Sequence, residues 1–436
     1  MGLLPRSGRM ANREPRTGDL PRPLLVGCDS DPRQTTFHRM TASSARGLHK
    51  SGPEYRESSP PPHLPDARIP RSTRAEKIRV CILAPSLELV GGQARQAERL
   101  LNGLAHEPSL EISFIPHTPR LPRPFRALQR IKYVRTVVNS VAYWAMLVTR
   151  LWRCDVVHAY SASYWSFLLT AAPAILLGKA YGKRVLLNYH SGEAEDHLRN
   201  WPLTAVPIIR LADLIVAPSG YLVDVFARYG LTARTIFNVV DVDVFTYRER
   251  VPTRPVFLTS RVHEPLYNVP CALRAFARVQ REYTDASLVV AGDGPLRPQL
   301  EALAAELGLR NTTFVGRISA QDMPAVYDAA DIFLTATNID NMPGSIIECL
   351  SCGLPIVTTE AGGIPYIVTH EETAMIVPLD DDAAMAESAM RLLTDEQLVA
   401  RLARTGREEA RRYTWDAVRE HWLDAYRELA GGANKR

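Results

Sequence analysis

From Ile78 onward, short runs of β-branched and apolar residues alternate with longer segments whose apolar residues recur at helical spacing. The first six candidate strands are Val80–Pro85, Leu110–Phe114, Val156–Tyr160, Val185–Tyr189, Leu214–Ala217 and Thr235–Phe237. Strands that alternate with helices form βαβ units, whose strands run parallel in one sheet. The pattern therefore predicts a parallel α/β sheet in the first half of the folded chain.

A second series with the same pattern follows Pro252-Thr-Arg-Pro255. Its candidate strands are Val256–Thr259, Leu288–Ala291, Thr313–Val315, Ile332–Ala336, Ile356–Thr359 and Met375–Val377. We predict an α/β fold with two doubly wound, Rossmann-like domains, residues 77–250 and 251–412, facing each other across a cleft, and a helix in 413–436 that packs back on the first domain. Because such sheets bind ligands outside the carboxyl ends of their strands, functional residues should follow strands.

Residues 1–76 show no such periodicity, and residues 1–75 hold eleven of the 32 prolines, so we predict a disordered basic extension. Thirteen Lys and Arg stand there against seven Asp and Glu, which leaves 39 basic and 40 acidic residues for the remainder. The overall net charge of +5 therefore indicates no nucleic-acid partner for the folded part.

The cysteines and the apolar stretches point to a cytoplasmic protein. The six cysteines are Cys28, Cys81, Cys154, Cys271, Cys349 and Cys352. The last two have the spacing of half a zinc site or of a redox pair, but no second Cys or His pair follows, so we expect reduced core residues. No apolar stretch reaches the about 18 residues that a membrane-spanning helix needs.

Two features of the first half follow predicted strands. Gly91 and Gly92 precede a helix, where glycines let the backbone approach an anion, although a tight strand-to-helix turn also needs glycine. His190 ends the strand predicted at Val185–Tyr189. It can face the cleft and donate to a substrate hydroxyl or titrate near neutrality; alternatively, the backbone of the loop satisfies it.

The segment 337–355 is the richest in candidate chemistry. Pro343 suits the first turn of a helix, because its missing N–H would have been unpaired there. The free N–H groups of Gly344, Ser345 and Ile346 then form an anion site that fits a diphosphate.

Two carboxylates frame this anion site. Glu348 shares the helix face of Gly344 and Ser345, and we expect an isolated carboxylate there that accepts two hydroxyl hydrogen bonds, as a ribose supplies. Asp340 precedes the helix and can contact sugar hydroxyls. Arg261 follows the first strand of the second series, where it is either a bidentate diphosphate ligand or an ordinary surface residue.

Residues 78–430 resemble the family 4 glycosyltransferases, which have the GT-B architecture. The features that carry the resemblance, in chain order, are Gly91-Gly92, His190, Ala217-Pro-Ser219, Asn238-Val-Val-Asp241 with Phe245, Ala291-Gly-Asp-Gly-Pro295, Phe314-Val-Gly316, Asp340 with Glu348, Cys352-Gly353-Leu-Pro355, Glu360-Ala-Gly362-Gly363-Ile-Pro365 and Tyr413-Thr-Trp415.

The resemblance implies a retaining transfer of a sugar from a nucleotide-sugar donor to an acceptor hydroxyl, with no cofactor and no metal required. The implied catalytic residues are His190, Arg261, Asp340 and Glu348, and the implied donor-binding residues are Gly91, Gly92, Arg261, Tyr267, Arg317, Asn341, Gly344, Ser345, Ile346 and Glu348. Glu348 would bind the donor ribose, Asp340 the donor sugar and Arg261 the leaving diphosphate, while His190 would touch the sugar near the reacting centre.

Three positions depart from the family pattern. Asp340 stands where glutamate is usual, and Pro343 stands where glycine is usual, which removes one backbone donor unless Gly344 substitutes. Tyr267 replaces a lysine, so one of two diphosphate cations is absent. Either Arg317 or the Tyr267 hydroxyl compensates, or the donor site is weakened.

Between residues 119 and 153 there are eight Lys and Arg and no acid, interleaved with five aromatic residues. Such a stretch can hold a protein to an anionic leaflet, which would suit a lipid-linked acceptor and a peripheral place at the inner face of the cytoplasmic membrane. The alternative is a sheet-covering helix behind a solvated basic loop.

The sequence leaves two further functions open. One is a GT-B nucleotide-sugar epimerase; the other, favoured by Tyr267 and Pro343, is a non-catalytic nucleotide-sugar binding protein. The base, the sugar and the acceptor, whether glycan or lipid-linked, are not encoded in any recognisable motif.

Overall fold

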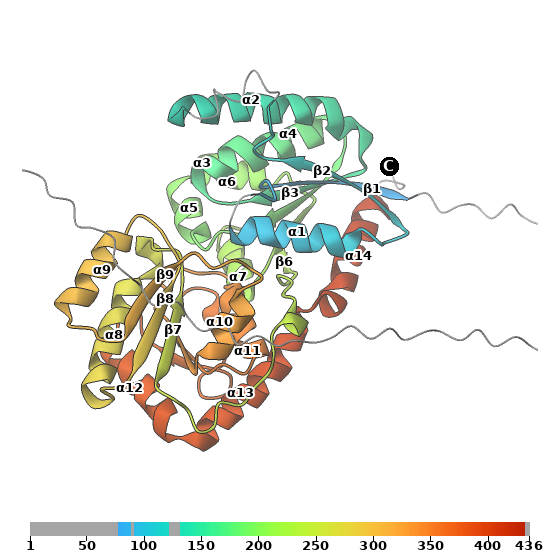
Figure 1. Cartoon of the computed structure of the whole chain (residues 1–436). Coiled ribbons are helices and arrows are strands. Elements are labelled where there is room, and N and C mark those ends of the chain that lie inside the picture. Colours follow the sequence, from blue (N-terminus) through green and yellow to red (C-terminus); the bar gives the residue numbers. More distant parts are fainter. Residues whose placement is uncertain (1–76, 89–90, 122–130, 432–436) are drawn as a thin grey trace, which may run out of the picture. The chain divides into compact units, whose positions relative to one another are not determined.

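The computed structural model describes residues 77–88, 91–121 and 131–431. Its first half holds a six-stranded parallel sheet in the order β2-β1-β3-β4-β5-β6 (Figure 1). The strands are β1 (Ile78–Ala84), β2 (Leu110–Pro116), β3 (Val156–Ser161), β4 (Arg184–Tyr189), β5 (Leu214–Ala217) and β6 (Ala233–Thr235). Because the chain winds outward in opposite directions from β1 and β3, the loops after these strands border a crevice.

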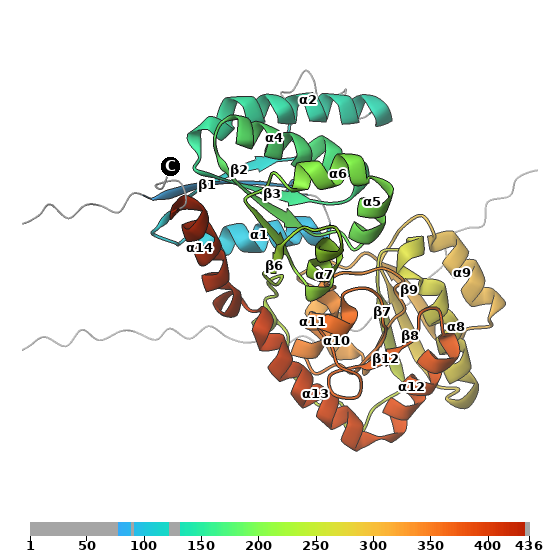
Figure 2. The ribbon, with the colours of Figure 1, turned by 180° about the vertical axis from the view of Figure 1, so that it is seen from behind.

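Helices cover both faces of this sheet. They are α1 (Gly92–Leu104), α2 (Lys132–Arg150), α3 (Tyr164–Ser166), α4 (Ala172–Ala180), α5 (Ala194–Asn200), α6 (Pro202–Ile209) and α7 (Gly220–Arg228), with a π-helical turn at Phe167–Ala171. Figures 1 and 2 show α1 on one side of the sheet and α2 and α4 on the other. Two apolar cores correspond to these layers: one contains Leu100 of α1 and Trp422 of the last helix, the other Leu147 of α2 and Ile175 of α4.

The second half repeats the architecture with the strand order β12-β11-β10-β7-β8-β9, again wholly parallel. Its strands are β7 (Val256–Ser260), β8 (Ser287–Ala291), β9 (Thr312–Gly316), β10 (Ile332–Thr335), β11 (Ile356–Thr359) and β12 (Met375–Val377). Its helices are α8 (Val269–Glu282), α9 (Arg297–Glu306), α10 (Met323–Ala329), α11 (Gly344–Ser351), α12 (Asp382–Thr394), α13 (Glu396–Ala410) and α14 (Trp415–Gly431). Here β7 and β10 are the neighbours from which the chain winds outward, so their loops meet at the crevice.

The predicted fold class is confirmed, since both halves are doubly wound parallel sheets. One strand was misplaced: β6 occupies Ala233–Thr235, whereas Thr235–Phe237 was predicted. Ile236 and Phe237 produced the apolar signal, but they pack in the core after the ladder has ended. The predicted domain limits stay predictions; α14 contacts β1, β3 and β4 of the first sheet.

Five of the six cysteines are described, and all five are buried free thiols, whereas Cys28 lies outside the described residues. The predicted extension 1–76 lies outside them as well. Within the described part of the chain, no helix combines the length and the apolar character needed to cross a membrane.

Candidate active site

The loop after β1 brings Gly91 and Gly92 to the start of α1. Gly91 has an extended backbone with φ 169°, which any residue can adopt, so the turn itself does not require glycine there. A Cβ atom on either glycine would meet no described atom within 4 Å. Neither backbone strain nor packing within the protein therefore explains the pair, and access of a ligand to the backbone remains as the predicted reason.

The loop after β10 leads into α11, whose start differs from the prediction in two details. Pro343 is the N-cap residue and does not lie in the first turn. Its carbonyl accepts a hydrogen bond of 3.1 Å from the N–H of Ile346, so this N–H is not available to a diphosphate. Among the described residues the N–H groups of Gly344 and Ser345 have no such partner, and the Ser345 hydroxyl is buried without one.

Glu348 is 5% exposed, and the prediction that its carboxylate is isolated was wrong. The Tyr327 hydroxyl of α10 donates to its Oε2 at 3.0 Å. Arg95 Nη1 and Arg99 Nη2, both on α1 of the first half, lie 3.6 and 3.7 Å from its Oε1. Sequence reasoning missed these partners because they come from elements far away in the chain, although Arg95 and Arg99 share one face of α1 at a spacing of four residues.

Arg261 and Asp340 meet where the loops after β7 and β10 adjoin. Arg261 Nη2 lies 2.9 Å from Asp340 Oδ2, at angles that do not form a hydrogen bond, and Arg261 Nε donates to the Thr335 hydroxyl at 3.0 Å. The guanidinium carbon also lies 5.4 Å from the centre of the Tyr267 ring, which is within cation–π distance. The two charges thus balance each other, and their predicted contacts with diphosphate and sugar stay predictions.

A pair of glycines shapes the loop that carries Asp340 and Asn341. A Cβ atom on Gly362 would lie 2.2 Å from the Asp340 carbonyl oxygen, and one on Gly363 would lie 1.8 Å from that of Asn341. The N–H of Gly363 donates to the Asp340 carbonyl at 3.0 Å. Only residues without a side chain allow this approach, so the glycines hold the carboxylate loop in place.

Two contacts bring residues of the first half against this loop. The Ser219 hydroxyl, after β5, donates to Asn341 Oδ1, while Asn341 Nδ2 is buried without a partner. A Cβ atom on Gly192 would lie 3.2 Å from the carbonyl carbon of Asp340. The loop that follows His190 therefore packs directly against the loop of the predicted sugar-binding acid.

His190 follows β4, as predicted, but it does not titrate near neutrality. Burial lowers its pKa to about 3, so the imidazole is neutral at pH 7. Its ring stacks on Tyr160 with centroids 4.9 Å apart, and its Nε2 is buried without a partner, so the loop backbone does not satisfy the ring. The expectation of titration failed because the sequence does not show how far the loop excludes water; a neutral N–H that donates to a hydroxyl stays a prediction.

The two residues considered as substitutes for the missing lysine lie in different surroundings. Tyr267 ends a short 3-10 turn (Pro265–Tyr267) and faces Arg261. Arg317, after β9, is 66% exposed and lies 4.0 Å from Asp293. The described contacts therefore join Tyr267 to the Arg261–Asp340 pair and do not join Arg317 to it.

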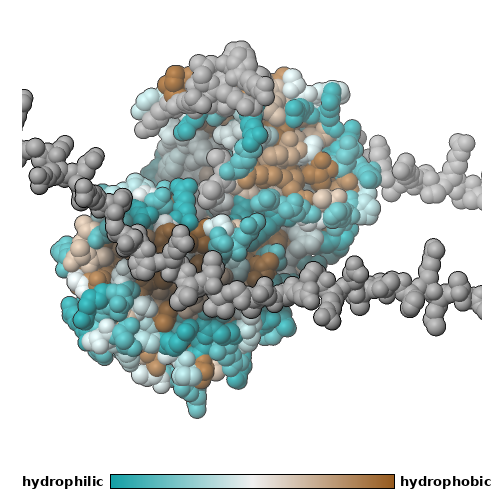
Figure 3. Space-filling model, viewed as in Figure 1, coloured by the Kyte–Doolittle hydropathy of each residue, from teal (hydrophilic) through white to brown (hydrophobic). Residues whose placement is uncertain are grey.

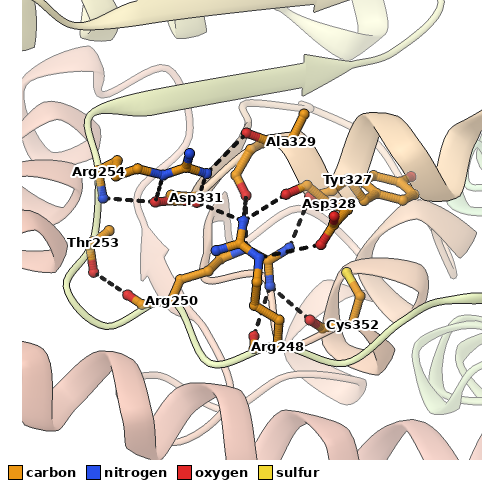
Figure 4. A network of polar contacts seen from close by, with 10 residues as sticks. Arg248, Arg250, Thr253, Arg254, Tyr327, Asp328, Ala329, Asp331 and Cys352 are labelled. Atoms are coloured by element: carbon orange, nitrogen blue, oxygen red, sulfur yellow. Dashed lines mark hydrogen bonds and ion pairs between the residues drawn. The ribbon is translucent and has the colours of Figure 1, made fainter. Parts of the chain in front are cut away.

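A buried arginine at the junction of the halves supports α10 and α11 (Figure 4). Arg250 is 1% exposed and donates to four main-chain carbonyls: Ala330 at 2.7 Å, Arg248 at 3.0 Å, Cys352 at 2.7 Å and Tyr327 at 2.9 Å. Cys352 ends α11 and Tyr327 lies on α10, the two helices that carry the Glu348–Tyr327 hydrogen bond. Sequence reasoning missed Arg250, because the charged run Arg248-Glu249-Arg250 before Val251-Pro252 is typical of a solvated connection between domains.

The described residues contain no group of three or more His, Cys, Asp or Glu side chains placed to hold a metal ion. His197, the remaining histidine of interest in the first half, is fully buried and shares a hydrogen bond of 2.8 Å with the Tyr189 hydroxyl. The positive groups of the site are arginines and the two free N–H groups of α11, an arrangement that suits an anionic ligand with hydroxyl groups beside it.

Comparisons with known proteins agree with this geometry. Residues 90–244 match the model of "Glycosyltransferase Family 4", and residues 247–409 match that of "Glycosyl transferases group 1". A D-inositol 3-phosphate glycosyltransferase from Saccharomonospora viridis is 33% identical over 258 residues, 54% of this chain and 56% of that protein. A phosphatidyl-myo-inositol mannosyltransferase from Mycobacterium leprae is 24% identical over 354 residues, 78% of this chain and 90% of that protein. The chain spans 41% to 59% of the length of the first three curated relatives it matches.

Solved structures show the same fold at low sequence identity. HepE from Anabaena, in complex with UDP-glucose, has a TM-score of 0.61 at 15% identity, covering 82% of this chain and 100% of that one. A sucrose-phosphate synthase from Thermosynechococcus elongatus has a TM-score of 0.61 at 18% identity, with 82% and 100% covered. With a family model matched on each half and two facing doubly wound sheets of the GT-B type, the chain belongs to the family 4 glycosyltransferases.

Proposed function

We propose that this protein is a retaining glycosyltransferase that moves a sugar from a nucleotide-sugar donor to an acceptor hydroxyl in glycan, polysaccharide or glycolipid synthesis. The observation that carries the proposal is the frame around the N-terminus of α11. Asp340 precedes it, Glu348 lies on its inner face, the N–H groups of Gly344 and Ser345 are free, and Arg261 adjoins Asp340. The structures of HepE in complex with UDP and glucose and with UDP-glucose support a nucleotide-sugar donor.

The chemistry we propose is electrostatic stabilisation of a departing diphosphate. The acceptor oxygen bonds to the anomeric carbon on the face from which the phosphate oxygen leaves, and that phosphate oxygen takes the acceptor proton. Arg261 and the N–H groups of Gly344 and Ser345 would stabilise the charge that develops on the diphosphate. The neutral His190 would donate to a sugar hydroxyl. We propose that these groups suffice without a metal ion, so activity should persist when a metal chelator is added to the assay.

A panel of UDP-, GDP- and ADP-sugars tests the proposal, with nucleotide release followed in the presence of glycan and lipid-linked acceptors. Release that depends on an acceptor, with a product whose anomeric configuration matches that of the donor by NMR, is the expected result. Epimerised donor without acceptor would replace the transferase by an epimerase. Tight donor binding without nucleotide release would favour a non-catalytic binding protein. The motivation for this alternative is Tyr267, which stands where the family has a lysine.

Glu348→Gln provides the matched variant, because it keeps the shape of the side chain and removes its charge. Under the proposal it weakens donor binding, since the ribose hydroxyls lose an anionic acceptor. Unchanged affinity for the donor would contradict the role of Glu348, whatever the activity of the wild-type enzyme.

We also propose that the protein is peripheral to an anionic leaflet through residues 119–153. The buried face of α2 packs on the sheet through Tyr143 and Leu147. Its opposite face exposes an apolar stripe at helical spacing, 36% to 64% exposed: Val134, Val137, Val141, Trp144 and Val148. Figure 3 shows brown surface on the part of the first half where α2 lies in Figure 1. A helix that both covers the sheet and exposes apolar residues between basic ends fits a lipid surface.

The basic residues of this segment are not equivalent. Arg120 forms an ion pair with Glu88, so it contributes little net charge, whereas Arg153 stacks on Trp152 at 5.0 Å with no carboxylate partner described. Arg123, Arg126 and Arg130 lie outside the described residues. Each basic residue near an anionic surface contributes about 1 kcal/mol.

Co-sedimentation with vesicles of anionic or zwitterionic lipid tests this attachment. We expect Val141→Asp to release the protein from anionic vesicles. Val244→Asp, at an exposed valine of the 3-10 turn Val242–Val244, should leave binding unchanged. Equal sedimentation of the two variants would refute the role of α2. Binding to neither lipid, together with a dimer in light scattering that Val141→Asp dissolves, would assign the stripe to a second copy of the chain.

A further inference from the structure

Two arginines of the first half share the carboxylate of Glu348. Arg261 and Asp340 form one pair with no net charge. Arg95 and Arg99 both approach the single carboxylate of Glu348, beside the free N–H groups of α11, and Asp241 is a second acid that acts on Arg99. Arg95 thus shares a carboxylate that Arg99 also contacts, and positive charge near a helix N-terminus favours an anion.

The two arginines of α1 are held very differently. Arg99 is the more buried, with a side chain 19% exposed, and its Nη1 donates to the Val239 carbonyl at 2.8 Å. Arg95 is 40% exposed, and the polar partner described for it is Glu348 Oε1 at 3.6 Å, beyond hydrogen-bond length. Arg95 therefore gives up little when its guanidinium turns to another anion, whereas Arg99 stays fixed by the Val239 carbonyl.

Arg95 also lies close to the predicted diphosphate site. Glu348 Oε1, its present partner, is 3.9 Å from the position of a Cβ atom on Gly344, whose N–H is one of the two free donors. Arg95 stands three residues after Gly92, in the first turn of α1. Its side chain thus starts in the helical turn that follows the glycine pair of one half and reaches Glu348 of α11 in the other.

We propose that Arg95 supplies the second cation for the donor diphosphate, in place of the lysine that Tyr267 replaces. When the ribose hydroxyls take Glu348 as their acceptor, Arg95 turns from this carboxylate to the phosphoryl oxygens, which a guanidinium binds bidentately. Arg99 remains as the counter-charge that orients Glu348. The inference rests on the proposed function, because it names a further donor ligand of the same site.

Calorimetric titration with UDP, GDP and ADP and with the matching nucleosides tests this role. With the diphosphate that the wild type binds, Arg95→Gln should weaken affinity about tenfold or more, as expected for a lost charged hydrogen bond, while nucleoside affinity stays unchanged. Arg95→Lys should restore part of the loss. Arg427→Gln, which removes an exposed, ion-paired arginine of α14, is the matched control and should bind as the wild type does.

Repeating Arg95→Gln in a protein that already carries Glu348→Gln shows whether Arg95 binds the phosphate or only pairs with Glu348. Under the proposal, Arg95→Gln still weakens diphosphate binding in the double variant. The proposal would be overturned if this effect vanished in the double variant, or if the single variant Arg95→Gln bound the diphosphate at least as tightly as the wild type. Failure of the wild type to bind any of the three diphosphates would refute the proposed function itself. Diphosphate binding with a silent Arg95→Gln would refute this inference alone.

Discussion

Replacing Arg250 by methionine should destabilise the protein strongly, although no substrate contact is assigned to this side chain. Arg250 donates four hydrogen bonds of 2.7 to 3.0 Å to main-chain carbonyls. Hydrogen bonds from a charged donor contribute about 1.5–3 kcal/mol each, and the carbonyls would be left buried and unpaired. Burial of the Arg250 cation is unfavourable, as its lowered pKa shows. Methionine fills a similar volume and removes this cost, which is several kcal/mol. The balance is a loss of about 4 kcal/mol.

The loss should extend to donor binding, because two of the four carbonyls belong to the helices behind Glu348. The Tyr327 carbonyl lies on α10 and the Cys352 carbonyl ends α11 (Figure 4). When these helices are no longer tied to Arg250, the Tyr327 hydroxyl and Glu348 lose their fixed separation of 3.0 Å. We therefore expect weaker nucleotide affinity in the fraction of Arg250→Met that is folded.

Urea unfolding followed by circular dichroism measures the change, with Arg404→Met as the control. Arg404 is 68% exposed and pairs with Glu249, and an exposed ion pair contributes little to stability. The midpoint of Arg250→Met should fall far below that of the control, since domains are stable by only about 5–15 kcal/mol. Equal midpoints for the two variants would refute the assignment of Arg250 as the tie between α10 and α11.

Three further predictions concern groups of the site and its core. Tyr327→Phe removes the donor to Glu348 Oε2 and should cost about 1.5–3 kcal/mol in urea unfolding; no change would show that the hydrogen bond does not form in solution. Burial lowers the pKa of His158 to about 3 and that of His197 to about 4, whereas a histidine of the unfolded chain has a pKa of about 6.5. The unfolded chain therefore binds more protons below pH 6.5, so the free energy of unfolding decreases as the pH is lowered. Each histidine should remove about 1 kcal/mol between pH 6.5 and 5.5, and greater stability at pH 5.5 would contradict this. Because the pKa of His190 is lowered to about 3, kcat/KM should show no acid limb near pH 6.5; such a limb, abolished by His190→Gln, would show that the side chain is solvated.

The fold could be predicted because its signal is local. Buried parallel strands are short β-branched runs, and β5, β11 and β12 lie at the predicted residues. The prediction for β6 was displaced because apolar residues beyond the strand pack equally well in the core, and hydropathy does not distinguish a ladder from a buried loop. Gly362 and Gly363 entered the prediction only through the family resemblance, and the structure adds the physical reason: they leave room for a backbone that no side chain could share.

The meeting of Arg261 and Asp340 could be predicted, but the contacts of Glu348 could not. Topology brings Arg261 and Asp340 together, because their loops follow the neighbouring strands β7 and β10. The partners of Glu348 come from α10 and from α1 of the other half of the chain, and nothing in the sequence around Glu348 predicts these contacts. The error about Pro343 had a different cause, because a proline one residue before a helix and one inside its first turn produce nearly the same pattern.

The aromatic residue at position 267 has a consequence for how the charges of the site are divided. A lysine there would place a second cation beside Arg261, within the same half of the protein. Tyr267 instead offers a neutral ring to the Arg261 guanidinium, and the other arginines described beside the α11 N-terminus are Arg95 and Arg99 of α1. Under the proposed role of Arg95, neutralisation of the donor diphosphate therefore requires α1 and α11 to lie against the same ligand, and donor affinity becomes a measure of how closely the two halves approach.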